Sequence, residues 1–154
     1  MSEALDALYR DILMDHYRNP RGKRKLLNPE IHNHGENPLC GDELEMEIKI
    51  DGDRVADIYV SCAGCAVSVS SGSMLAEIIK GKSLAEVKRI ARAVKAMLTG
   101  GEVIDEIELG DLEVLEGVKK FPVRVKCALL SWATLVNSLE SYEHGLETKV
   151  SSTE

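Results

Sequence analysis

Cysteine residues set the chemistry that this sequence can perform. The chain has four of them, Cys40, Cys62, Cys65 and Cys127, and Asp42 follows the first after a single glycine. Zinc takes cysteine thiolates together with a carboxylate oxygen, usually as four ligands in a tetrahedron. The Cys-x2-Cys spacing suggests by itself that Cys62 and Cys65 bind the same ion, and an iron-sulfur cluster would use the same thiolates. Five candidate ligands are therefore available for one metal site.

The cellular compartment decides how these cysteines are interpreted. The N-terminus has neither the basic region nor the apolar region of a secretory signal, and no apolar run is long enough to cross a membrane. We therefore expect a cytoplasmic protein, in which cysteines are metal ligands or reactive thiols rather than disulfides. The net charge of -7 argues against a nucleic-acid partner, because nucleic-acid binding relies on an excess of Lys and Arg.

Length and composition predict one globular domain. A chain of 154 residues buries roughly two-thirds of its unfolded surface, and its 44% hydrophobic and 29% charged residues are ordinary for a globular protein. Aromatic residues make up only 4%, so the core must be aliphatic. We expect a single domain over residues 1–147 and a disordered polar tail over residues 148–154.

A predicted hairpin brings two of the cysteine-bearing turns together. From residue 43 to residue 50 charged and apolar residues alternate strictly, as in a half-buried strand. Asp51-Gly52-Asp53 supplies a turn, and residues 55–60 make the returning strand. Because a hairpin returns its second strand beside the start of its first, the turn at Cys40–Asp42 and the turn at Cys62–Cys65 should lie at the same end of the sheet.

Helices are predicted on both sides of this hairpin. An amphipathic helix should run from Ser2 to Asn19, and residues 20–39 form a long connection with room for a short edge strand. His32 and His34 lie in that connection, where solvation is the more frequent role than metal ligation. A buried helix over residues 66–80 places Cys65 at its N-terminus, where backbone N–H groups and the helix dipole favour a thiolate.

The second half of the chain is predicted to be helical. Ser83 and Glu86 form a capping box that opens a helix with a basic face, ended by Gly100-Gly101. An acidic connector with a short helix from Asp111 follows, and a last helix starts at Phe121-Pro122 with Cys127 in its first turns. The predicted fold class is α+β, a small antiparallel sheet of about three strands packed against several helices.

Three motifs in order resemble the U-type iron-sulfur cluster assembly proteins, and within them the SufU branch. The motifs are Cys40-Gly41-Asp42 after Asn37-Pro38, then Gly64-Cys65-Ala66-Val67-Ser68, then residues 121–129 with Trp132. Two features favour SufU over the IscU scaffold branch, namely the insertion from residue 100 to 120 and Lys126, where IscU proteins have histidine before the last cysteine. The resemblance implies the SufU/IscU-like fold.

The resemblance also implies a ligand set and an activity. It assigns a zinc ion to Cys40, Asp42, Cys65 and Cys127, and Cys62 falls where the family has glycine, as a bystander thiol or a nearby redox partner. Arg124 matches an arginine that would offset the negative charge and could hydrogen-bond Asp42. The implied activity is zinc-dependent acceptance of sulfur from a pyridoxal-phosphate-dependent, SufS-like cysteine desulfurase, which passes its persulfide sulfur to Cys40.

Two points remain open from the residues alone. In the family a histidine of the desulfurase is thought to displace Cys40 from zinc, whereas simple ligand chemistry makes the carboxylate of Asp42 the weakest ligand to a soft ion. The alternatives in function are a scaffold on which an iron-sulfur cluster is assembled and a purely structural zinc module. A downstream iron-sulfur scaffold would be a second partner if sulfur transfer is the function.

Overall fold

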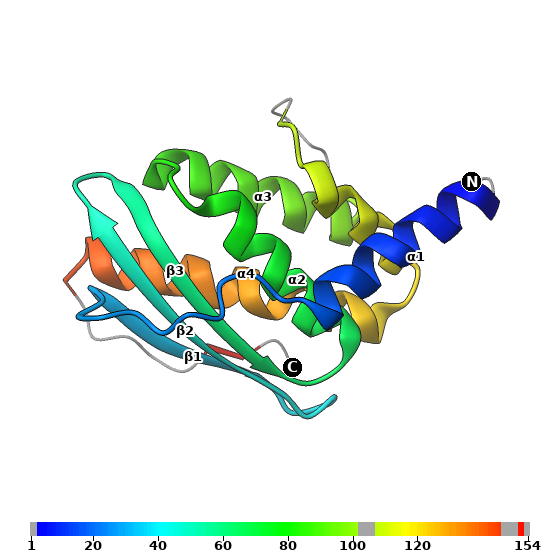
Figure 1. Cartoon of the computed structure of the whole chain (residues 1–154), viewed down its shortest axis with the longest axis horizontal. Coiled ribbons are helices and arrows are strands. Elements are labelled where there is room, and N and C mark those ends of the chain that lie inside the picture. The colour runs from blue at the N-terminus through cyan, green and yellow to red at the C-terminus, as the bar shows by residue number, and fades with distance from the viewer. Residues whose placement is uncertain (1–2, 102–106, 146–150, 153–154) are drawn as a thin grey trace.

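The computed structural model describes residues 3–101, 107–145 and 151–152, and its fold is α+β as predicted. Helices pack against one face of a sheet whose three long strands are antiparallel, and the other face of the sheet points away from them (Figure 1). No helix in the described ranges is long and apolar enough to cross a membrane. In chain order the elements are α1 (Glu3–Arg18), β1 (Ile31–Asn37), β2 (Asp42–Asp51), β3 (Arg54–Ala63), α2 (Ala66–Ile79), α3 (Leu84–Thr99), the 3-10 helix η1 (Gly110–Val118), α4 (Pro122–Glu143) and β4 (Ser151–Ser152).

The predicted hairpin of β2 and β3 is confirmed and forms one side of the sheet, whose order is β3-β2-β1-β4. Gly52 adopts a φ of +63° in the connecting turn, which favours glycine. The apolar residues of β2 face the helices and are at most 7% exposed, as the alternation predicts: Leu44, Met46, Ile48 and Ile50. The register also places Ala63, the last residue of β3, opposite Glu43, so the two cysteine-bearing turns do meet at one end.

The connection over residues 20–39 differs from the prediction, because it contains a full strand. β1 has seven residues and pairs with β2 along its whole length, from Ile31 opposite Ile48 to Asn37 opposite Asp42. It lies inside the sheet, between β2 and the two-residue β4, rather than forming only a short edge. His32 and His34 are consequently strand residues and not loop residues.

β1 is hard to recognise from the sequence because its inward-facing positions 33 and 35 are not apolar. Asn33 points inward and donates from Nδ2 to Ser138 Oγ on α4 at 3.0 Å. At Gly35 a Cβ atom would lie 2.1 Å from Thr134 Oγ1, so α4 packs directly on the strand backbone. The strand therefore lacks the alternation of apolar residues by which β2 is recognised.

Two predicted segments fall wholly or partly outside the described residues. Residues 102–106 of the acidic connector are not described, and the short helix predicted from Asp111 is present as η1. Of the predicted disordered tail, only Ser151 and Ser152 are described, and they form β4, which pairs in parallel with β1.

Buried serines let α2 pack closely on α4. Ser71 donates from Oγ to the carbonyl of Ala128 at 2.6 Å and accepts from Trp132 Nε1 at 3.2 Å. The serine-rich composition of α2 thus serves the interior, because each hydroxyl hydrogen-bonds while occupying little volume. The predicted capping box of α3 is confirmed, with the backbone N–H of Glu86 donating to Ser83 Oγ at 3.2 Å.

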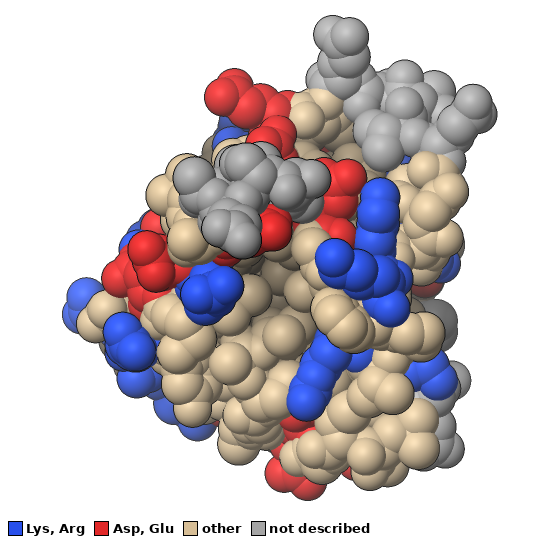
Figure 2. All heavy atoms as spheres, turned by 90° about the vertical axis from the view of Figure 1, so that its right-hand side faces the viewer, with Lys and Arg blue, Asp and Glu red and all other residues tan. Residues whose placement is uncertain are grey.

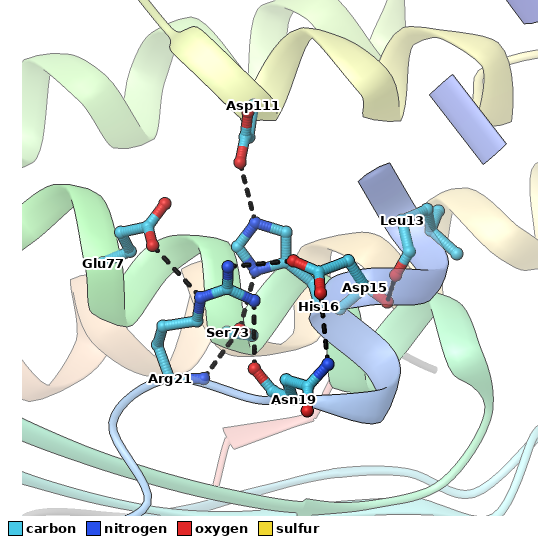
Figure 3. Close-up of polar contacts among 9 residues, drawn as sticks. Leu13, Asp15, His16, Asn19, Arg21, Ser73, Glu77 and Asp111 are labelled. Atoms are coloured by element: carbon cyan, nitrogen blue, oxygen red, sulfur yellow. Dashed lines mark hydrogen bonds and ion pairs between the residues drawn. The ribbon is translucent and has the colours of Figure 1, made fainter. Parts of the chain in front are cut away.

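A polar cluster around His16 attaches α1 to the rest of the protein (Figure 3). The imidazole is fully buried, with Nδ1 2.7 Å from Ser73 Oγ and Nε2 2.9 Å from Asp111 Oδ2. The backbone N–H of Arg21 also donates to Ser73 Oγ at 2.9 Å, and the Arg21 guanidinium hydrogen-bonds Asp15 and Glu77. The cluster therefore joins α1, α2 and η1 and fixes the start of the segment that leads to β1.

Candidate metal centre

Three separate parts of the chain meet at one end of the sheet. They are the turn between β1 and β2, the junction between β3 and α2, and the first turns of α4, which lie toward the right-hand end of the view in Figure 1. Figure 2 shows the molecule from that side, where Lys and Arg side chains flank a large area without charged residues. The predicted meeting of the cysteine-bearing segments takes place here.

The turn between β1 and β2 carries Cys40. The backbone N–H of Cys40 donates to the carbonyl of Asn37 at 3.2 Å, and Gly41 has a φ of +71°, a conformation that favours glycine. The turn closes where Asn37 and Asp42 pair in the register of the two strands. Cys40 is half-buried, so its thiol lies at the margin of the protein rather than in its core.

Asp42 is fixed by the start of α2. Its side chain is 1% exposed; Oδ1 accepts from the backbone N–H of Cys65 at 2.9 Å and Oδ2 accepts from Ser68 Oγ at 2.7 Å. A Cβ atom at Gly64 would lie 2.2 Å from Asp42 Oδ1, so only glycine leaves room for the carboxylate. The orientation of Asp42 is therefore set by three residues of the β3–α2 junction.

The other two thiols approach from the helices. Cys65 is the N-cap residue of α2, half-buried, with Sγ 3.8 Å from Asp42 Oδ2. Cys127 on α4 is fully buried, and its Sγ lies 3.3 Å from Cys40 Sγ and 3.9 Å from Asn37 Nδ2. Two helices and one turn thus contribute one thiol each.

The donor atoms fit a tetrahedral zinc ion. Single ligand atoms of Cys40, Asp42 and Cys127 all lie within 4.8 Å of one another, and Cys65 adjoins this group through its contact with Asp42. Two thiolates bound to one zinc at ~2.3 Å are about 3.8 Å apart, and the sulfur atoms of Cys40 and Cys127, 3.3 Å apart, would need to separate only slightly to hold the ion. Three sulfurs and one oxygen are also a donor set that zinc accepts.

The protonation state of the Cys127 thiol would change when a metal ion binds. Burial opposes ionisation of Asp42, but the hydrogen bonds from Cys65 and Ser68 outweigh it and lower the pKa of that carboxyl group. Burial, followed by the contacts with Asp42 and Cys40, raises the pKa of the Cys127 thiol. In the metal-free protein Cys127 is therefore a neutral thiol beside a carboxylate, and a bound metal ion would favour its thiolate.

Arg124 lies one helical turn before Cys127, at the exposed start of α4. Its hydrogen bond with Cys127, followed by the charge of Cys65, raises the pKa of the guanidinium. The guanidinium of Arg124 thus lies beside the thiols, as predicted. Asp42, the partner suggested by the sequence, receives its hydrogen bonds from Cys65 and Ser68 instead.

Cys62 lies apart from the group formed by Cys40, Asp42 and Cys127. It is on β3, opposite Leu44, and packs against the hydrophobic core. Burial, followed by the negative charges of Asp42 and Cys65, raises the pKa of its thiol to about 12. Cys65 is also outside that group but contacts Asp42, so the bystander role of Cys62 stays a prediction.

Two contributors to the site have roles that the sequence did not reveal. Ser68 supports Asp42 and also lies 3.2 Å from the carbonyl of Cys127, and Gly64 provides the space that the carboxylate fills. The available signal for Ser68 was its position three residues after the N-cap Cys65, at the first turn of a largely apolar helix. For Gly64 the signal was only its place before Cys65.

Comparisons with known proteins agree with this fold. The model of the NifU-like N-terminal domain matches residues 8–128. The zinc-dependent sulfurtransferase SufU of Bacillus subtilis is 44% identical over 141 residues, which cover 92% of this chain and 95% of that protein. The iron-sulfur cluster assembly scaffold protein IscU of Streptococcus pyogenes is 34% identical over 146 residues, with 88% and 85% covered.

Comparison with solved structures agrees with the fold. A SUF-system protein from Fervidobacterium islandicum, described as an iron-sulfur cluster assembly scaffold, superposes with a TM-score of 0.80 at 33% identity and covers 90% of this chain and 99% of its own. The N-terminal part of a NifU-like protein from Brucella abortus has a TM-score of 0.81 at 21% identity, with 91% and 97% covered, and supports the fold alone. The chain belongs to the family of NifU-like N-terminal domains.

Proposed function

We propose that this protein is a zinc-dependent sulfur acceptor, a sulfurtransferase that takes persulfide sulfur from a cysteine desulfurase for iron-sulfur cluster assembly. The observation that carries the proposal is the gathering of the Cys40 and Cys127 thiols with the buried carboxylate of Asp42, with Cys40 on a turn at the protein margin. The thiol of Cys65 adjoins this group, 3.8 Å from Asp42 Oδ2. The 44% identity with a relative named as a zinc-dependent sulfurtransferase supports the same activity.

The proposed ligands of the zinc ion are Cys40, Asp42, Cys65 and Cys127. Bound zinc would keep the thiols deprotonated near neutral pH and hold the turn and the two helices together. Asp42 is already oriented by hydrogen bonds from α2, so it adds little ordering cost when the ion binds.

Cys40 is the proposed sulfur acceptor because of where the three thiols lie. Cys127 is fully buried on a long helix, and Cys65 is the N-cap of α2 beside the carboxylate. Cys40 is held by a turn, which can change its backbone angles without disturbing a helix, and its neighbour Leu39 is 65% exposed. A partner's persulfide can therefore reach Cys40 with the smallest rearrangement. Asp42, although an oxygen ligand, is too firmly hydrogen-bonded to be the group that moves.

The transfer step balances without an external oxidant or reductant. The Cys40 thiolate attacks the outer sulfur of the persulfide on the desulfurase, a bond forms between Cys40 Sγ and that sulfur, and the sulfur-sulfur bond of the desulfurase breaks. The electron pair of that bond leaves with the desulfurase cysteine as a thiolate, and Cys40 becomes the persulfide. Arg124, beside Cys127 and Cys65, would offset the negative charge of the site during the step.

Exposed apolar side chains beside the site suit a docking partner. Leu39 next to Cys40, together with Phe121 and Val123 at the start of α4, are 65%, 55% and 54% exposed. These residues border the two segments that carry Cys40 and Cys127, and large exposed apolar groups at a reactive site are typical of protein contacts. The pyridoxal phosphate cofactor of the reaction belongs to the desulfurase, and we propose that the encounter takes place in the cytoplasm. A downstream iron-sulfur scaffold would then receive the sulfur.

Assembly of an iron-sulfur cluster on this protein is the second candidate, because relatives named as scaffold proteins share 34% and 33% identity. The two functions differ in the metal that the purified protein carries. Protein purified without air should contain about one zinc ion per chain and show no visible absorption band if it is the sulfur acceptor. An iron-containing chromophore would support the scaffold instead.

A desulfurase assay tests the proposal. Adding the zinc-loaded protein should stimulate sulfide or alanine production by a SufS-like desulfurase, and the Cys40→Ala variant should abolish the stimulation. The Cys62→Ala variant is the matched control and should retain most of it. Stimulation that survives in Cys40→Ala would exclude the role given to that thiol, and equal losses in both variants would overturn the ligand assignment.

A further inference from the structure

Two histidines lie side by side on the outer face of the sheet, away from the helices. In β1 the side chains at positions 32 and 34 point to the same face, because side chains alternate along a strand, and both are exposed. The register with β2 places Glu45 opposite His34 and Glu47 opposite His32. Two imidazoles and two carboxylates therefore form one surface cluster.

We propose that His32, His34 and Glu45 bind a divalent transition-metal ion of the zinc class, at a site separate from the thiol centre. One ligand atom from each of the three residues lies within 4.8 Å of the other two. The imidazole rings have centroids 5.0 Å apart at an angle of 79°, and His32 Nε2 is 3.7 Å from Glu45 Oε1. Two histidines and one carboxylate are a ligand set typical of Zn²⁺, Ni²⁺ and Co²⁺ sites with open positions.

Glu47 strengthens the electrostatic attraction for a cation. Its side chain is nearly buried, Oε1 accepts from the backbone N–H of Leu26 at 3.1 Å, and Oε2 lies 4.0 Å from His32 Nε2. Because this carboxylate is held in place, its charge remains next to the imidazoles. An open hollow of about 440 Å³ adjoins the cluster, lined by His34 and several carboxylates, including Glu36, Glu43 and Glu45. It leaves room for water molecules as further ligands.

Lys25 indicates that the cluster already attracts a positive charge. Its Nζ lies 3.4 Å from Glu45 Oε1 and 4.0 Å from Glu47 Oε2. The side chain is 66% exposed, so the ammonium group can swing into water and leave the carboxylates to a metal ion. Lys25 is therefore a competitor for the site rather than a permanent part of it.

The two metal sites differ in donors and in position. The outer site offers nitrogen and oxygen, whereas the thiol centre offers three sulfurs and one oxygen. Positions 33, 35 and 37 of β1 face the helices and positions 32, 34 and 36 face outward. Asn37 and Asp42 border the thiol centre from the inner side, so the sheet lies between the two ligand sets. Binding at the outer site does not depend on sulfur transfer.

The test uses the full-length protein with its thiol centre loaded with zinc. Calorimetric titration with Zn²⁺ should show about one additional equivalent of binding. In His34→Ala the affinity for this equivalent should fall by at least about 10-fold, because losing a direct ligand costs no less than losing a residue that only orients a ligand. The His144→Ala variant, which removes another exposed histidine, should bind like the unmodified protein. Both variants should keep the melting temperature, because the substituted side chains are exposed.

A second readout identifies the donors. Co²⁺ added to the zinc-loaded protein should give weak visible bands without the near-ultraviolet charge-transfer absorption of thiolate ligands. Lys25→Ala should raise the affinity a few-fold by removing the competing ammonium. The proposal is overturned if the zinc-loaded protein binds no further ion, if His34→Ala binds it equally well, or if the bound cobalt shows thiolate absorption.

Discussion

Among the buried polar clusters in the described part of the chain, two receive a serine from α2, one around His16 and one around Cys127. Around His16, ordinary hydrogen bonds of 2.7 to 2.9 Å join the imidazole to Ser73 and Asp111 (Figure 3). Around Cys127, the thiol has long sulfur contacts of 3.3 to 3.9 Å, and Asn37 Oδ1 is buried without a hydrogen-bond partner among the described residues. The polar groups around His16 are hydrogen-bonded within the chain. The donor atoms around Cys127 instead form a set that a bound metal ion would complete.

We infer from this difference that the cluster around His16 serves stability and that the thiol centre serves chemistry. One arrangement of hydrogens satisfies both contacts of His16, with the Ser73 hydroxyl donating to Nδ1 and Nε2–H donating to Asp111. Such a network stabilises a unique arrangement of α1, α2 and η1. The thiol centre instead places a raised pKa at Cys127 next to a lowered one at Asp42, a combination typical of metal and reactive sites.

The largest effects are expected when the central residue of each cluster is replaced by alanine and the two variants are compared. Cys127→Ala should abolish zinc retention and stimulation of the desulfurase, because it removes a proposed ligand and leaves the turn unanchored. His16→Ala should lower the free energy of unfolding of the metal-free protein by about 2–4 kcal/mol, since it empties a buried position and removes the hydrogen bonds of the imidazole with Ser73 and Asp111. The zinc content of His16→Ala should stay unchanged; a zinc loss equal to that of Cys127→Ala would contradict the separation of roles.

A smaller effect is expected from filling the space beside Asp42. In Gly64→Ala the new Cβ would meet Asp42 Oδ1 and turn the carboxylate away, so the zinc affinity should fall by about 10–100-fold. Gly117→Ala is the matched control, because its Cβ would point into open space. Competition with a chromophoric chelator measures both affinities, and an unchanged affinity in Gly64→Ala would show that Asp42 is not a ligand.

Replacing one serine of α2 in each cluster tests the same difference between the thiol centre and the cluster around His16. Ser68→Ala should reduce zinc affinity by about 10-fold, since Asp42 loses its shortest hydrogen bond. Ser73→Ala should leave zinc binding intact and lower the free energy of unfolding by about 1–3 kcal/mol, because His16 and Arg21 lose a shared partner. Chemical denaturation and zinc titration of both variants provide the measurement. Identical profiles for the two variants would contradict the distinction between the clusters.

The smallest effect is expected at Cys62. Because the pKa of this thiol is raised to about 12 in the folded protein, it stays protonated at pH 8 and should be alkylated far more slowly than in the unfolded chain. The rate should increase as the pH rises toward 12, and the folded state should lose stability above pH 9, where the unfolded thiol ionises first. Mass spectrometry of alkylated peptides checks the rate. Rapid labelling of Cys62 at pH 8 would show that the thiol is not held neutral.

The sequence was informative where local pattern and topology coincide. The alternation in β2 and the turn at Gly52 predicted the hairpin, and the hairpin brought Cys40 and Cys65 to one end of the sheet. The family resemblance, rather than any periodicity, added Cys127, because its helix is far away in the chain. The resemblance also left Cys62 out of the ligand set, whereas the Cys-x2-Cys spacing alone predicts that Cys62 and Cys65 bind the same ion.

The remaining features depend on tertiary contacts that a sequence pattern does not contain. β1 was hidden because its inward positions are Asn33, which hydrogen-bonds α4, and Gly35, which α4 touches directly. The role of Ser68 appears only when α2 meets Asp42, and the cluster of His32 and His34 requires the register of β1 with β2. A residue's partner across the fold decides its role in each case.

The central claim is that Cys40 receives the sulfur. A single turnover of a cysteine desulfurase with cysteine and the zinc-loaded protein, followed by alkylation and peptide mass spectrometry, tests it directly. We predict that the added mass of one sulfur atom appears on the peptide containing Cys40 and is absent from those containing Cys62 and Cys127. Sulfur found first on Cys65 or Cys127 with Cys40 unmodified, or on no cysteine of this protein, would contradict the account.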